Sequence, residues 1–124
     1  MPRHIYSFGF RHGLTVHGTV ISPGPKLQAL DGALVVDVRK IIPRNPYRND
    51  SLRNLRGDHP DVIADILKNP GLARGYAGLL ELVKDFGGEV YVGCTGGHHR
   101  SVYVADRLGR ELGVAVTHLN YADK

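Results

Sequence analysis

The stretch that most constrains this chain is Glu89–Val102, which reads Glu-Val-Tyr-Val-Gly-Cys-Thr-Gly-Gly-His-His-Arg-Ser-Val. Its β-prone start, Val90–Val92, predicts a strand, a helical pattern opens at Ser101, and a glycine-rich loop lies between them. Such a loop presents unpaired backbone N–H groups at a helix N-terminus, where the helix dipole favours negative charge. The segment therefore predicts a binding site for a phosphate-like anion, with Arg100 as a bidentate clamp.

The length of the chain, 124 residues, suits one compact domain with one core, so we expect a single domain over residues 1–124. A formal net charge of +4 favours anionic partners such as nucleotides, phosphosugars or nucleic acid. The one cysteine cannot form an internal disulfide, and no signal peptide or long apolar run is visible. We therefore expect a cytoplasmic protein with no membrane partner. Because no His-x-x-x-His or Cys-x-x-Cys spacing occurs, we expect no metal and no cofactor.

Strands are predicted near residues 4–10, 34–38, 89–93 and 114–118, and apolar stripes predict helices over residues 60–67, 72–86 and 101–112. Leu14–Ile21 is expected to add a short edge strand. Lys26–Asp31 is ambiguous, with one helical turn as an interpretation. This order of elements predicts an α/β fold, a three-layer domain with a mostly parallel central sheet flanked by helices.

Folds of this class bind ligands at the carboxyl ends of their strands. That rule gathers residues that are distant in the sequence: Arg11, His12, Asp37, Arg39, the Cys94–Arg100 loop and His118. Asp37 is then expected to accept hydrogen bonds from ligand hydroxyls or an amine. His99, next to the arginine clamp, is expected to help hold the anion, and His98 is expected to be a solvated loop residue.

Residues 39–57 form a long irregular segment that carries six cations: Arg39, Lys40, Arg44, Arg48, Arg53 and Arg56. A loop of this length in a small domain is more often functional than idle. We expect it to cover the anion site or to contact RNA, with Arg44, Arg48, Arg53, Arg56 and His118 as the basic residues. The alternative is a solvated connection without a specific role.

The loop has a second interpretation, because Cys94–Ser101 fits Cys-x5-Arg-Ser, the phosphate loop of the protein tyrosine phosphatase superfamily. Cys94 would then be the nucleophile, and Asp37 or Asp58 the general acid. Gly93 departs from that superfamily, which usually carries a histidine there. A third interpretation treats the cysteine as a small buried residue that ends a strand.

A longer match is carried by four segments in order along the chain: Ser7–Gly13 (Ser-Phe-Gly-Phe-Arg-His-Gly), Val36–Arg39, Leu52–Gly57 and Gly93–Val102. Together they resemble the C-terminal domain of the RNase adapter protein RapZ family, from about Tyr6 to His118. In that family the domain follows a P-loop ATPase-like domain, which this sequence does not contain. We therefore expect a stand-alone version of the domain.

The resemblance also implies a pocket for a phosphorylated metabolite, an amino-sugar phosphate in the bacterial adapter, with contacts to a small RNA and a homodimer. The family's pocket residues correspond to Asp37, Thr95, Gly96, Gly97 and Arg100, with Cys94 beside them. Where the family often carries a histidine in an Asn-Pro-His stretch, this chain has Tyr47.

The expected function is a sensor or adapter domain that binds a small phosphorylated ligand, an amino-sugar phosphate or a nucleotide, and that is not an enzyme. The expected ligand-binding residues are Asp37, Arg39, Tyr47, Cys94, Thr95, Gly96, Gly97, His98, His99, Arg100 and Ser101. A cysteine-dependent phosphatase and a non-specific RNA-binding module stay open as alternatives.

Overall fold

A computed structural model describes residues 1–16, 19–21, 27–30 and 32–120. Its elements are, in chain order, β1 (His4–Gly9), η1 (Phe10–His12), β2 (Leu14–Val16), β3 (Thr19–Ile21), β4 (Leu27–Leu30), β5 (Ala33–Asp37), η2 (Pro46–Arg48), α1 (Pro60–Ile66), α2 (Leu72–Lys84), β6 (Glu89–Cys94), α3 (Arg100–Leu112) and β7 (Val116–His118).

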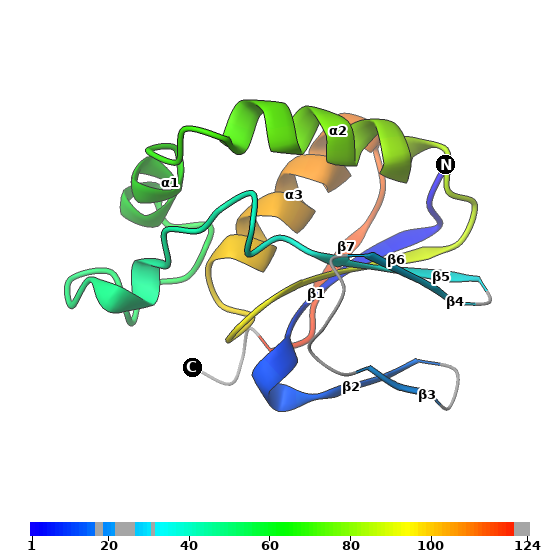
Figure 1. The fold of residues 1–124 in the computed structure, drawn as a ribbon, viewed down its shortest axis with the longest axis horizontal. Helices are drawn as coiled ribbons and strands as arrows, with labels where there is room; N and C mark the ends of the chain where they lie inside the picture. Colours follow the sequence, from blue (N-terminus) through cyan, green and yellow to red (C-terminus); the bar gives the residue numbers. More distant parts are fainter. Residues whose placement is uncertain (17–18, 22–26, 31, 121–124) are drawn as a thin grey trace.

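The central sheet has five strands in the order β4-β5-β6-β1-β7. Strands β5, β6, β1 and β7 are parallel, and β4 pairs antiparallel with β5. The helices lie on one face of this sheet, and a separate β2–β3 hairpin lies on the other (Figure 1). The predicted α/β domain with a mostly parallel central sheet is confirmed.

Each face of the sheet has its own hydrophobic core, because successive side chains of a strand point to opposite faces. Ile5, Val90 and Val92 are fully buried in the larger core, which also contains the apolar stripes of the helices. Phe8 and Val35 belong to the smaller core on the hairpin side. A fully buried side chain of this size contributes about 1.5–3 kcal/mol of transfer free energy, so both faces hold the sheet in place.

Two segments differ from the sequence-based expectation. The helical-turn interpretation of Lys26–Asp31 is wrong where the structure describes the segment, because Leu27–Leu30 is the edge strand β4; positions 26 and 31 lie outside the described residues. Leu14–Ile21 is divided into β2 and β3, which pair with each other and not with the central sheet.

Helix α3 fixes the position of the glycine-rich loop, because its first turns are almost completely buried against β1 and β6. Val102, Val104 and Leu108 have no exposed surface. The helix ends at Leu112, and the positive φ of Gly113, 67°, allows the left-handed C-cap. Within the described part of the chain, no helix is long and apolar enough to cross a membrane.

Two glycines on α2 provide a matched test of how the rest of the protein packs against α2. An added Cβ would meet nothing at Gly78, but at Gly75 it would lie 2.5 Å from Ile41 Cγ2. Gly78→Ala should therefore stabilise the protein by about 0.5–1 kcal/mol. In Gly75→Ala the steric overlap, which costs about 1–3 kcal/mol, should outweigh that gain. Urea unfolding of both variants checks the expectation, and equal shifts in one direction would contradict it.

Candidate anion-binding site

The glycine-rich loop begins where β6 ends and closes where α3 starts, at the carboxyl edge of the sheet (Figure 1). Two backbone hydrogen bonds hold its carbonyl groups: Arg11 N donates to Thr95 O at 3.0 Å, and Gly57 N donates to His98 O at 2.7 Å. No group in the described ranges accepts a hydrogen bond from the backbone N–H of Gly96 or Gly97. The carbonyl groups of Thr95 and His98 are therefore bound within the protein, and the amides of the two glycines are not.

Close packing against β1 shapes this loop. Gly97 has a positive φ of 80°, and a Cβ there would lie 2.6 Å from Gly9 N. The Gly9 N–H in turn donates to Asn120 Oδ1 at 2.7 Å. Glycine is thus required at position 97 both for its backbone conformation and for its close approach to β1.

Arg100 is the first residue of α3, and only 4% of its surface is exposed. Its Nη1 donates to the Ile42 carbonyl at 3.0 Å, and its Nη2 donates to Thr95 Oγ1 at 3.3 Å. Its Nε is buried and has no hydrogen-bond partner among the residues that the structure describes. Burial lowers the pKa of this guanidinium, although nearby Cys94 and Asp37 act in the opposite direction. An arginine remains charged even so.

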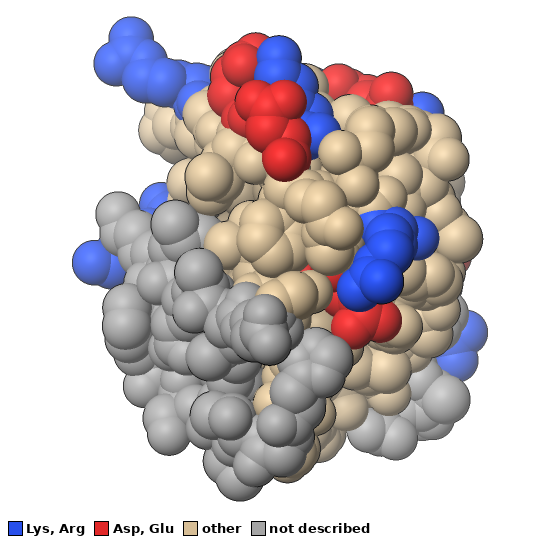
Figure 2. Space-filling view, turned by 90° about the vertical axis from the view of Figure 1, so that its right-hand side faces the viewer, with Lys and Arg blue, Asp and Glu red and all other residues tan. Residues whose placement is uncertain are grey.

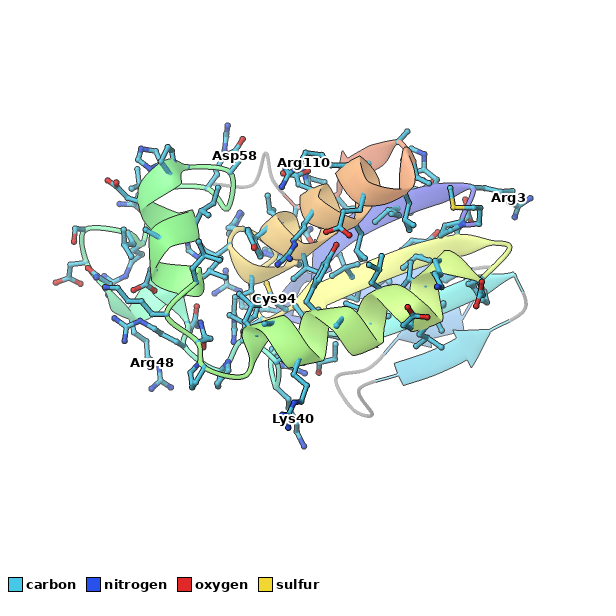
Figure 3. The ribbon with its side chains drawn as sticks, turned by 90° about the horizontal axis from the view of Figure 1, so that it is seen from above. Arg3, Lys40, Arg48, Asp58, Cys94 and Arg110 are labelled. Carbon is cyan, nitrogen blue, oxygen red and sulfur yellow. The ribbon has the colours of Figure 1, made fainter. Side chains whose placement is uncertain are left out.

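Cys94 lies at the base of the loop and is 2% exposed (Figure 3). Its thiol donates to the fully buried Ser101 hydroxyl, with an Sγ–Oγ distance of 3.2 Å. The residue before it, Gly93, faces the rings of Phe8 and Phe10, which occupy the space that a side chain would need. The histidine that phosphatases of the Cys-x5-Arg type usually carry at that position has no room here.

Asp37 ends β5 and is 9% exposed. Its two carboxylate oxygens accept four hydrogen bonds from Arg39: one from the backbone N at 3.0 Å, two from Nε at 3.0 and 3.1 Å, and one from Nη2 at 2.6 Å. The Arg39 guanidinium also lies 4.7 Å from the centre of the Phe10 ring. The acid and the arginine therefore form a closed pair.

A cavity of about 150 Å³ opens over the loop, and it is lined by Arg11, Asn45, Tyr47, Cys94, Thr95, Gly96, His98, His99 and Arg100. Seven of the predicted ligand-binding residues line it. The other four do not: Gly97 and Ser101 support the loop from behind, and Asp37 and Arg39 bind each other.

Several residues lie elsewhere than the sequence suggested. His98, expected to be solvated, is only 8% exposed. Arg11 and Asn45 line the cavity but were not among the predicted ligand-binding residues. Arg11 follows the end of β1, so the strand-edge rule was the signal for it. Asn45 carried no such signal, because its position depends on how residues 39–57 fold.

The basic segment between β5 and α1 is held by carboxylates. Arg44 Nε lies 2.8 Å from the buried Asp65 Oδ1, and Arg53 Nη2 lies 2.9 Å from Asp50 Oδ1. Arg48 projects outward at this end of the molecule (Figure 3). A larger open hollow of about 810 Å³, lined in part by Arg44, Asn45 and Arg48, adjoins the cavity through Asn45.

The face that carries the amino ends of the strands has a different character. Where Figure 2 shows described residues, its basic and acidic side chains lie beside each other. His118 does not line the cavity. Its Nδ1 lies 2.5 Å from Ser7 Oγ, and its Nε2 lies 2.9 Å from Asp106 Oδ1, so it joins β7 to β1 and α3. Among the described residues, no group of three or more His, Cys, Asp or Glu side chains is placed to hold a metal ion.

The two adjacent glycines of the loop should respond differently to alanine. At Gly96 the nearest atoms to an added Cβ are 3.7 Å away or more, an ordinary contact. Gly96→Ala should therefore change the free energy of unfolding by less than about 1 kcal/mol. Gly97→Ala should cost at least about 2 kcal/mol, because alanine disfavours positive φ and the Cβ overlaps β1. Chemical denaturation measures both, and a tolerant Gly97→Ala would contradict the described loop.

Comparison with known proteins identifies the family of this chain. The RapZ C-terminal domain family matches residues 1–122. Similar proteins named "nucleotide-binding protein" occur in Deinococcus radiodurans (36% identical over 118 residues, covering 87% of this chain and 36% of the relative) and Mycobacterium tuberculosis (40% over 114 residues, 84% and 33%). Another occurs in Azotobacter vinelandii (39% over 120 residues, 87% and 36%). The chain spans about a third of the length of these curated relatives. It belongs to the RapZ C-terminal domain family.

Proposed function

We propose that this domain is a binding module, a sensor or adapter, that holds the phosphate group of a small ligand in the loop formed by residues 95–101. The observation that carries the proposal is the Arg100 Nε, a buried donor without a partner in the described part of the chain, on a side chain that lines the cavity. Buried polar groups normally have hydrogen-bond partners, so such a donor indicates a missing acceptor.

The physical case for an anion is the sum of three contributions. The other two donor groups of Arg100 are bound to Ile42 and Thr95, so the guanidinium is already oriented. The Gly96 amide, in the cavity wall, and the start of α3 offer further donors and a favourable dipole. A phosphate has enough oxygens to accept from all of them at once. Because the donors are preorganised, little conformational entropy is lost when the anion binds.

The name that these relatives carry is consistent with a binding role, but it describes proteins about three times as long as the matched region. Nucleotide binding by this domain is therefore part of the proposal, as are an amino-sugar phosphate ligand, contact with RNA and association of two copies. A reducing compartment such as the cytoplasm suits a chain whose one cysteine is a buried thiol.

Arg100→Lys tests the proposal, because lysine keeps the charge but loses the planar fork. The affinity for inorganic phosphate, measured by calorimetry on the full chain, should fall at least ~10-fold, since charged hydrogen bonds contribute about 1.5–3 kcal/mol each. Arg74→Ala, on the exposed surface of α2, is the control and should bind as the unaltered protein does.

The thermal unfolding of Arg100→Lys is measured alongside the calorimetry, because Arg100 also donates to the Ile42 carbonyl and its replacement lowers stability if that bond is lost. A variant that remains folded and binds phosphate with unchanged affinity would show that the anion site is wrong.

A cysteine-dependent phosphatase is the second candidate, and the hydrogen bond between Cys94 and the Ser101 hydroxyl favours it. If the thiol lost its proton, the Ser101 hydroxyl would donate to the sulfur instead and stabilise a thiolate leaving group. Two observations favour binding instead: no carboxylate among the described residues lines the cavity, and Asp37 is bound by Arg39. A general acid of the expected kind is therefore missing from the cavity wall.

We expect no release of phosphate from a generic aryl phosphate by the unaltered protein, because the cavity wall lacks that acid. Cys94→Ser is the control, and it should retain phosphate binding because serine is similar in size. Turnover by the unaltered protein that disappears in Cys94→Ser would establish the phosphatase instead.

A further inference from the structure

We propose that Asp65, a buried residue of α1 that does not line the cavity, is a positioning residue for ligand binding. It acts on the part of the ligand beyond the phosphate group, by holding the wall that residues 43–51 form. This inference rests on the proposed function, since it assumes that the phosphate occupies the loop of residues 95–101.

The size of the cavity assigns the two parts of a ligand to two different walls. Cavities that enclose a complete small ligand usually measure about 300–1,000 Å³, so 150 Å³ holds little more than the phosphate end. The adjoining hollow of about 810 Å³ is lined entirely by residues between Pro43 and Ser51. The rest of a phosphorylated ligand therefore lies against residues 43–51, and its affinity depends on where this segment is held.

Arg44 attaches this segment to α1 and to the turn after it. Its backbone N donates to Asn69 Oδ1 at 2.9 Å, and its Nε donates to Asp65 Oδ1 at 2.8 Å. Asn69 is itself fixed, because its Nδ2 donates to the Ile66 carbonyl at 2.7 Å. The Asp65 side chain is 4% exposed, and a carboxylate at this depth needs a partner. The ion pair therefore holds Arg44 in one place.

The residue after Arg44 carries this position into the cavity wall. Asn45 caps the short helix η2: its Oδ1 accepts from Tyr47 N at 3.1 Å, and its carbonyl accepts from Arg48 N at 3.1 Å. Asn45 and Tyr47, which both line the cavity, thus belong to one hydrogen-bonded turn. This turn lies beside α1 (Figure 1). A change at Asp65 is therefore expected to displace both wall residues together.

The phosphate loop is held by different contacts. Arg11 N donates to Thr95 O, and Gly57 N donates to His98 O. Arg100 is oriented by the Ile42 carbonyl and the Thr95 hydroxyl. Asp65 takes part in none of these four hydrogen bonds. Its replacement should therefore weaken the binding of a phosphorylated sugar but not the binding of phosphate alone.

Calorimetry on the full chain, with inorganic phosphate and glucosamine 6-phosphate as probes, tests the proposal in Asp65→Ala. This variant leaves Arg44 half-exposed to water, whereas removal of Arg44 would leave a buried carboxylate unpaired. The unaltered protein should bind the sugar phosphate more tightly than phosphate. In Asp65→Ala this ratio of affinities should fall at least ~5-fold, because Asn45 and Tyr47 must then be ordered when the ligand binds. The affinity for phosphate should stay within ~2-fold.

Two further variants control this measurement. Asp61→Ala changes an exposed acid of the same helix and should leave both affinities unchanged. Asp65→Asn keeps the size of the side chain and an oxygen that can accept from Arg44 Nε, so its ratio should lie between those of Asp65→Ala and the unaltered protein. If Asp65→Ala does not fold, the ratio in Asp65→Asn decides, and it should be lower than that of the unaltered protein.

An unchanged ratio in the folded Asp65 variants would overturn the inference, and so would an equal loss of affinity for both probes, which indicates a general effect on the fold. If the unaltered protein binds both probes equally, the segment of residues 43–51 does not contact the sugar, and the inference fails while the phosphate site stands. Failure of both probes to bind the unaltered protein would overturn the proposed function itself.

Discussion

The buried guanidinium of Arg100 is the constraint on which the rest of the site depends. It joins the segment after β5, through the Ile42 carbonyl, to the loop after β6, through the Thr95 hydroxyl. A charge at this depth is costly unless it is fully hydrogen-bonded, so its two internal bonds hold together segments that are far apart in the sequence. Its Nε has no hydrogen-bond partner among the described residues. The same residue therefore closes the fold and lines the cavity.

The fold was largely predictable because its signals are local. The β-branched run at 34–38 and the apolar stripes of the helices agree with the observed elements to within a few residues. β4 was missed because Leu27–Leu30 has four residues and no β-branched side chain. Its strand conformation comes from pairing with β5. The Asp31-Gly32 dipeptide, which is typical of two-residue hairpins, was the signal that could have revealed it.

The part of the cavity wall that the loop forms was predictable, and the rest was not. The order of strand, glycines and helix start predicts that the loop lies at the carboxyl edge of the sheet, and Thr95, Gly96 and Arg100 line the cavity there. Whether Asp37 faces a ligand depends on the conformation of the Arg39 side chain, which binds it, and no sequence pattern predicts that conformation. Asn45 reaches the cavity because Arg44 is anchored on Asp65 and Asn69 in another part of the chain. Such contacts arise from tertiary packing, which sequence periodicity does not describe.

The contact between Ser7, His118 and Asp106 joins three elements through one imidazole ring. A neutral imidazole can accept from the Ser7 hydroxyl at Nδ1 while Nε2 donates to the Asp106 carboxylate. One side chain of the edge strand β7 thus contacts both its neighbour β1 and the helix α3. The helix that begins with the Arg100 clamp is therefore tied to the sheet at a point well away from the cavity that the clamp lines.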